Sequence, residues 1–226
     1  MSLMRAASKG YEPPFPDETS GVWDRGITPF TWEGDDITGG LSITGFDDLL
    51  ASDTVYVLYV CDTNAIGSCT LEGESMTSVY NSGDNSPRTQ LYSITGIVGA
   101  SSLTLSASVT SACCFIAFCV DLGWTLSNSE WFNGSSGMPN PPSITGVATD
   151  DTFVTIGALD DDEVTATAPS GYTLYAVEST IVTGGTARCS AAMTADDGLS
   201  GTVNAGAYGG AGSDFWWAGS LIFSPV

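Results

Sequence analysis

The chain has 226 residues, of which 14% are charged, and its 26 acidic residues against 5 basic ones give a net charge of −21. This imbalance excludes binding to nucleic acid or to an anionic membrane surface, because both need Lys and Arg to replace counterions. The chain contains no His, which excludes Ser-His-Asp and Cys-His catalytic sites and any zinc site that needs an imidazole.

Residues 1–27 combine several prolines with isolated aromatic residues, Tyr11, Phe15 and Trp23, and follow neither a helical nor a strand period. We predict an extended N-terminal arm here. It is either a disordered tail or a tether that orders on a partner, with the three aromatic side chains as anchors. No apolar stretch follows its positive charges, so it does not resemble a secretory signal, and we expect synthesis and assembly in a cytoplasm.

From residue 28 onward, short β-branched and aromatic stretches alternate with clusters of Gly, Asp, Asn and Ser. Residues 54–61 predict a strand buried on both faces, 103–109 alternate as a half-buried strand does, and 113–120 predict a second core strand. No window has a convincing helical period, and no apolar run is long enough to span a bilayer. The sequence predicts an all-β protein without a membrane segment.

One stretch, Ser42-Ile43-Thr44-Gly45, returns 101 residues later as Ser143-Ile144-Thr145-Gly146. The apolar run that begins at Ser111 has a counterpart that begins at Ser213, 102 residues later. We therefore predict two diverged copies of one β unit, residues 28–121 and 142–226, with a joint at 122–141. The same spacing places Arg88 opposite Arg188, and we expect these two cations to form matched structural ion pairs.

The prediction for residues 28–226 is a single jelly-roll-like β-sandwich made of these two repeated halves. The competing arrangement is two tandem sandwiches, since about 100 residues suffice for a small sandwich. Two tryptophans in the joint, Trp124 and Trp131, have two interpretations. Either they cover the seam between the halves, or they are exposed as a platform for a sugar or a partner.

Cysteine positions indicate buried thiols, because Cys61, Cys114 and Cys119 lie in or at the end of apolar runs. A disulfide between Cys61 and Cys69 is the alternative pairing. We predict no catalytic residue and no cofactor, and we expect that the protein is not an enzyme. Paired carboxylates could in principle hydrolyse glycosides, but adjacent acids in turns are ordinarily solvated. Calcium is the one metal with a candidate site, at Asp160, Asp161, Asp162 and Glu163.

Several segments together resemble a family of duplicated jelly-roll proteins found among the virion structural proteins of tailed bacteriophages. They are the core-strand end Cys119-Val120-Asp121, the turn Pro169-Ser170-Gly171-Tyr172-Thr173 and the final strand that opens with Phe215-Trp216-Trp217-Ala218. Members of this family are decoration, minor tail or fibre-associated components.

The resemblance implies a virion protein assembled in the host cytoplasm, with other virion proteins such as the major capsid protein as partners. It also implies a homo-oligomer, either a trimer or monomers around a local threefold axis. A capsid decoration protein docked through its arm accounts for the acidic body, which would repel packaged DNA. A tail- or fibre-associated module that binds host surface glycans is the alternative.

Overall fold

A computed structural model describes residues 30–46, 49–61, 68–83, 86–121, 123–160, 167–181, 188–210 and 214–226. These residues form antiparallel β-sheets, and none of them is helical, as the sequence predicts. Since no helix occurs in these ranges, none could cross a membrane.

The described residues contain fourteen strands. They are β1 (Phe30–Phe46), β2 (Thr54–Cys61), β3 (Ser68–Leu71), β4 (Glu74–Ser75), β5 (Thr77–Asn81), β6 (Arg88–Thr95), β7 (Ala100–Val120), β8 (Trp124–Gly134), β9 (Ile144–Val147), β10 (Thr152–Leu159), β11 (Thr173–Ile181), β12 (Arg188–Asp197), β13 (Gly201–Val203) and β14 (Trp216–Pro225).

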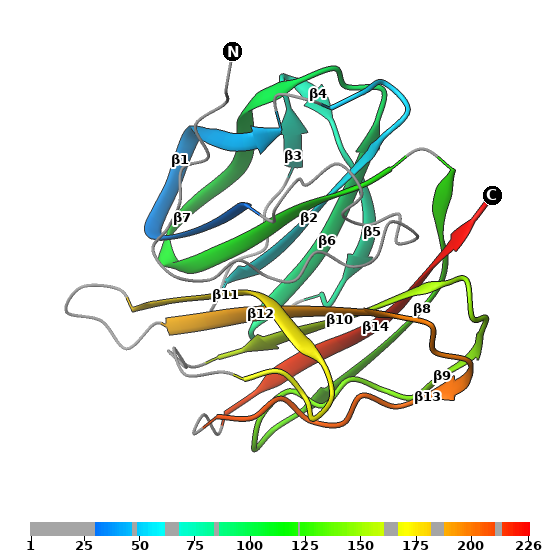
Figure 1. The fold of residues 1–226 in the computed structure, drawn as a ribbon. Helices are drawn as coiled ribbons and strands as arrows, with labels where there is room; N and C mark the ends of the chain where they lie inside the picture. The colour runs from blue at the N-terminus through cyan, green and yellow to red at the C-terminus, as the bar shows by residue number, and fades with distance from the viewer. Residues whose placement is uncertain are drawn as a thin grey trace, which may run out of the picture.

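Sheet A uses the N-terminal half of the chain, with the strand order β4-β3-β7-β2-β6-β5 and β1 also paired to β7. Sheet B uses the C-terminal half, with the order β11-β12-β10-β14-β8, and the short strands β9 and β13 pair with each other. Figure 1 shows sheet A, blue to green, above sheet B, green to red. The fold is β-sandwich-like, and each large sheet draws its strands from one side of the sequence.

Most buried apolar side chains of the described residues lie in three layers. The inner core lies between sheets A and B. It contains Tyr56, Leu58, Val60, Leu91, Cys114, Ile116, Phe118, Val120, Val154, Ile156, Ala158, Ala191, Met193, Ala195, Leu221 and Phe223. The first outer core, on the other face of sheet A, includes Val55, Tyr59, Cys69, Leu71 and Phe115. The second outer core, on the other face of sheet B, includes Ile144, Phe153, Val203 and Ile222. Strand alternation explains why β2 is buried on both faces, since odd and even residues enter different cores.

The two large sheets share a pairing register across five strands. β2 pairs with β7 from Thr54 opposite Val120 to Cys61 opposite Cys113. β10 pairs with β14 from Thr152 opposite Phe223 to Leu159 opposite Trp216. A shift of 98 residues for the first strand and 103 for the second therefore superimposes all eight residue pairs.

The neighbouring strands obey the same rule. β2 with β6 and β10 with β12 match over eight pairs, with shifts of 98 and 102 residues. The edge pairs match including an irregularity, which lies between Ser78 and Tyr80 in β5 and between Leu174 and Ala176 in β11. On the other side, Trp32 of β1 lies opposite Phe115, as Phe132 of β8 lies opposite Ala218. The order β1-β7-β2-β6-β5 thus corresponds to β8-β14-β10-β12-β11.

This register corrects two details of the sequence alignment. Residues 124–134, in the predicted joint, form β8 within sheet B, and residues 130–134 correspond to residues 30–34 at the start of β1. Arg88 lies opposite Cys61, but the residue opposite the corresponding Leu159 is Ser190. Arg188 is therefore two positions away from the counterpart of Arg88. The guanidinium of Arg88 donates to the carbonyl of Gly83 at 3.4 Å, and the ion-pair expectation stays a prediction.

The alignment of the last strands also moves by one residue. Cys113 corresponds to Trp216, since both lie opposite the last residue of the central strand, Cys61 or Leu159. The sequence had placed Phe215 there. An alignment that is wrong by one residue matches side chains on opposite faces of a strand. The observed shift of 103 matches Phe118 with Leu221, and both belong to the inner core.

Candidate functional site

A cluster of two carboxylates and a thiol lies where β2 begins and β7 ends. Ligand atoms of Asp53, Cys119 and Asp121 all lie within 4.8 Å of one another. The antiparallel pairing of Thr54 with Val120 explains this, because it places the residue before β2 beside the residue after β7. Asp53 is 2% exposed and Asp121 is 8% exposed. Of the described residues, these three form the set that could ligate a divalent cation.

Asp53 already has a structural role in this cluster. Its Oδ2 accepts the amide of Leu50 at 2.8 Å, and its own amide donates to the carbonyl of Leu50 at 2.9 Å. Asp side chains that bond the backbone in this way stabilise tight turns. The carboxylate therefore holds the turn that leads into β2.

Sheet B provides an internal comparison for this cluster. Asp151, 98 residues after Asp53, accepts the amide of Ala148 at 2.7 Å and donates its own amide to the carbonyl of that residue at 3.1 Å. The register places Ile222 and Ser224 where Cys119 and Asp121 lie in sheet A. The same buried Asp turn thus occurs beside an apolar side chain and a hydroxyl, so the turn does not depend on a metal. We assign Asp53 to the turn.

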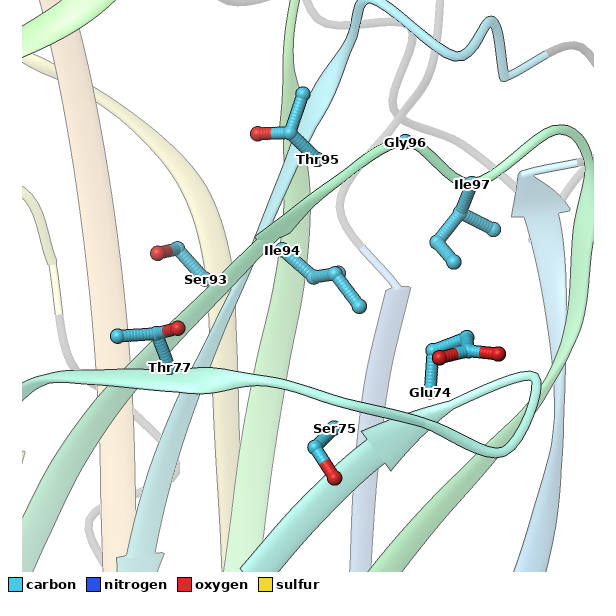
Figure 2. Close-up of a pocket in the computed structure, with 8 residues that line it drawn as sticks. All are labelled: Glu74, Ser75, Thr77, Ser93, Ile94, Thr95, Gly96 and Ile97. Atoms are coloured by element: carbon cyan, nitrogen blue, oxygen red, sulfur yellow. The ribbon is translucent and has the colours of Figure 1, made fainter.

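A second candidate is a shallow hollow of about 560 Å³ beside β4, β5 and the end of β6. It is lined by Glu74, Ser75, Thr77, Ser93, Ile94, Thr95, Gly96 and Ile97. Figure 2 shows Ile94, Ile97 and Glu74 on one side, whereas Ser93 and Thr95 point the other way, as alternation along β6 requires. Thr95 is also bonded to the hydroxyl of Thr54 at 2.9 Å. The polar groups of the hollow do not converge on a common point, which a specific ligand site needs.

The aromatic residues of the predicted joint lie on the seam between the sheets. The ring of Trp131 stacks on Tyr80 of β5, with centroids 3.8 Å apart and planes 3° from parallel. A Cβ added to Gly219, which lies opposite Trp131, would be 2.8 to 2.9 Å from three atoms of the same ring. The ring therefore lies against both Tyr80 and Gly219. Trp124 is half-buried and packs against the inner core. Both tryptophans pack at the seam, as the seam-covering interpretation expects, and Trp131 is half-buried.

Burial alters the chemistry of the tyrosines around the cores. Desolvation raises the pKa of Tyr56 to about 12, opposed by a backbone hydrogen bond with Leu126. Tyr208 is fully buried, and desolvation raises its pKa above the ordinary range, opposed by hydrogen bonds with Thr155 and Thr194. The phenol of Tyr208 donates to the carbonyl of Thr155 at 3.0 Å, and its ring covers Gly157. A phenol bonded in this way fixes a loop and is not available as an acid or base at neutral pH.

The remaining predicted site residues are dispersed or lie outside the described ranges. Asp160 accepts the hydroxyl of Ser86 at 2.6 Å, so it joins the two halves of the chain. The other predicted calcium ligands, Asp161, Asp162 and Glu163, lie outside the described residues. The arm anchors Tyr11, Phe15 and Trp23 also lie outside them.

Four cysteines follow the expectation of buried thiols. Cys61, Cys69, Cys114 and Cys119 are buried and form no disulfide, so the alternative Cys61–Cys69 bridge is not formed. The thiol of Cys69 donates to the sulfur of Met76 at 3.2 Å. Desolvation raises the pKa of Cys69 to about 12. Such a thiol is a weak nucleophile, because the thiolate is the reactive form.

The Asp53–Cys119–Asp121 cluster is the feature that sequence reasoning missed. Its signal was an acid just before one core strand and another just after its antiparallel neighbour. Reading this signal required the register between the strands, which spacing alone does not provide.

No family model, curated protein or solved structure matches the chain.

Proposed function

We propose that this chain is a virion structural protein of a tailed bacteriophage, and that it acts as a capsid decoration protein docked on the major capsid protein through residues 1–27. The proposal rests on the resemblance carried by the turn at Pro169–Thr173 and by the terminal aromatic strand. It also rests on the character of the chain, which is strongly acidic and whose described part buries apolar side chains on both faces of each large sheet.

The observation that carries the structural role is that apolar side chains of the described residues are buried in cores and that polar side chains bond the loops. Both large sheets have an apolar core on each face. Polar side chains fix the loops. The indole of Trp216 donates a hydrogen bond to the carbonyl of Ser136, and the hydroxyl of Ser220 donates one to the carbonyl of Pro142. A body of this kind is suited to a stiff, solvated component of a particle.

We further propose that the body is a jelly-roll-like sandwich whose two halves are copies of one unit. The shared register of five strands and the repeated Asp turn at Asp53 and Asp151 support the repeat. Glycan binding by a tail- or fibre-associated module is the competing function, and the stacking of Tyr80 on the Trp131 ring leaves less of that ring for a sugar.

The test removes the arm. A chain lacking residues 1–27 is expected to keep the circular dichroism and thermal unfolding of the full chain but to lose co-sedimentation with capsids assembled from the major capsid protein. Undiminished co-sedimentation would contradict docking through the arm. If the full chain binds no capsid but is retained on a glycan array, and Trp131→Ala abolishes that retention, the competing function holds instead.

A further inference from the structure

The two halves bury equivalent faces against each other. Under the observed shifts, the inner-core residues of sheet A correspond to inner-core residues of sheet B. The matched pairs are Tyr56 with Val154, Leu58 with Ile156, Val60 with Ala158, Leu91 with Met193, Phe118 with Leu221 and Val120 with Phe223. The residues between them point into separate outer cores, as Val55 and Phe153 do. Each half therefore contacts the other through the same side of its sheet.

Side chains of both halves meet between the two large sheets. Tyr56 of sheet A packs edge-on against Phe223 of sheet B, with ring centroids 5.3 Å apart. The residues that correspond to Tyr56 and Phe223, Val154 and Val120, also belong to the inner core. An isologous dimer likewise buries the same face of each subunit.

Each half also has an apolar core that the other half does not share. Among the described side chains, the first outer core draws on residues from 46 to 119 and the second on residues from 144 to 222. The inner core is the layer to which both halves contribute side chains. This separation is what two joined subunits show.

We propose that the inner face of each half is a pairing surface whose partner is another copy of the same β unit, so that the chain is a covalently joined dimer. This inference rests on the proposed repeat and is independent of the virion role. It requires that the two halves can separate at the inner core while each outer core stays intact.

Native cysteines report on the two layers of the N-terminal half. Cys114 lies in the inner core, whereas Cys61, Cys69 and Cys119 lie in the first outer core. Of these four cysteines, separation of the halves exposes only Cys114, whereas unfolding of the N-terminal half exposes all four. The rate at which each cysteine reacts with a thiol reagent, followed by peptide mass spectrometry, distinguishes these events.

The test substitution lies in the other half. Leu221→Ala removes a fully buried inner-core side chain of β14. It is expected to accelerate labelling of Cys114 by more than about tenfold, because the lost packing weakens the seam. Labelling of Cys61, Cys69 and Cys119 should change by less than about twofold. The matched control is Thr125→Ala at an exposed position of β8, which should change no rate.

Equal acceleration of all four cysteines by Leu221→Ala would overturn the proposal, because it would show one cooperative body. If this variant does not fold, the unmodified chain gives the answer in increasing urea. Labelling of Cys114 should then depend less steeply on urea than labelling of Cys69, since separation exposes less surface than unfolding. Identical dependences for the two residues would also overturn the proposal. The labelling and urea experiments use the chain without capsids, so their results do not depend on whether the arm docks on a capsid.

Discussion

At the scale of single residues, several glycines create space for aromatic rings. Gly219 lies under Trp131 and Gly157 lies under Tyr208. The register explains the pair formed by Gly157 and Tyr208 in sheet B. Gly157 corresponds to Tyr59 of sheet A, whose own ring fills the first outer core. The core volume that one half fills from its central strand is filled in the other half from a loop.

Gly219→Ala is expected to lower the free energy of unfolding by about 1–3 kcal/mol, because the added methyl overlaps the Trp131 ring and the close-packed seam gives little room. Urea denaturation followed by circular dichroism measures the change. The partner variant is Trp131→Ala, which removes the ring. In that background the same glycine substitution should have almost no effect. A loss of equal size in both backgrounds would show that the methyl group clashes with something other than the ring.

At the scale of elements, the prediction from sequence was best where a strand is buried on both faces. The expected strand at 54–61 is β2 residue for residue, because a short β-branched run between turn residues has few alternatives. The long strand β7 was predicted in two pieces, at 103–109 and 113–120, since polar residues between them resemble a break. In the structure it continues from Ala100 to Val120 and pairs along its length with β1.

Strand β8 lies within the predicted joint, 122–141, where the sequence did not indicate a strand. Its residues are mostly polar and half-buried or exposed, as befits the edge of a sheet, and edge strands lack the apolar period on which the prediction depended. The candidate site could not be predicted from the sequence either. Asp53 and Asp121 are separated by 68 positions, and only the pairing of β2 with β7 brings them together.

The hydrogen bond that the hydroxyl of Ser86 donates to the carboxylate of Asp160 connects the turn before β6 with the end of β10. Ser86→Ala is expected to lower the free energy of unfolding by about 1 kcal/mol, because a charge-assisted hydrogen bond is lost and a part-buried carboxylate keeps fewer donors. Thermal unfolding measures this loss. Asp160→Asn keeps an acceptor oxygen and should be milder. If calcium raises the melting temperature of the unmodified chain but not of Asp160→Asn, Asp160 binds calcium as the sequence hypothesis proposed.

At the scale of the whole molecule, the chain combines a strong negative charge with no histidine. His is the side chain whose ordinary pKa lies between pH 5 and 8. Its absence means that no histidine can make stability respond to pH in the neutral range. The buried groups with altered pKa values are mainly phenols and a thiol, and they respond at high pH.

Alkaline unfolding is therefore expected. Desolvation raises the pKa of Tyr56, Tyr92 and Cys69 to about 12 in the folded chain. A folded-state pKa above the unfolded value favours folding as long as the group is protonated. This stabilisation is complete below the ordinary pKa values, about 8.5 for Cys and 10 for Tyr, and is lost as pH rises towards 12.

Ultraviolet absorbance of tyrosinate and far-ultraviolet circular dichroism, followed together from pH 8 to pH 13, measure this behaviour. Ionisation of the buried tyrosines should coincide with loss of strand signal. Tyr92→Phe removes one of the ionising groups and should shift the transition to higher pH. A complete tyrosinate signal at pH 10 with the strands intact would contradict the burial of these phenols.

The irregularity in the edge strands has a bearing on the history of the chain. It interrupts β5 after Ser78 and β11 after Leu174, at the same step of the ladder in each sheet. Few residues are shared between the two edges, so similarity of sequence does not maintain it. If one half arose by duplication of the other, this defect is older than the duplication, and the ancestral gene already encoded a five-stranded sheet with a kinked border.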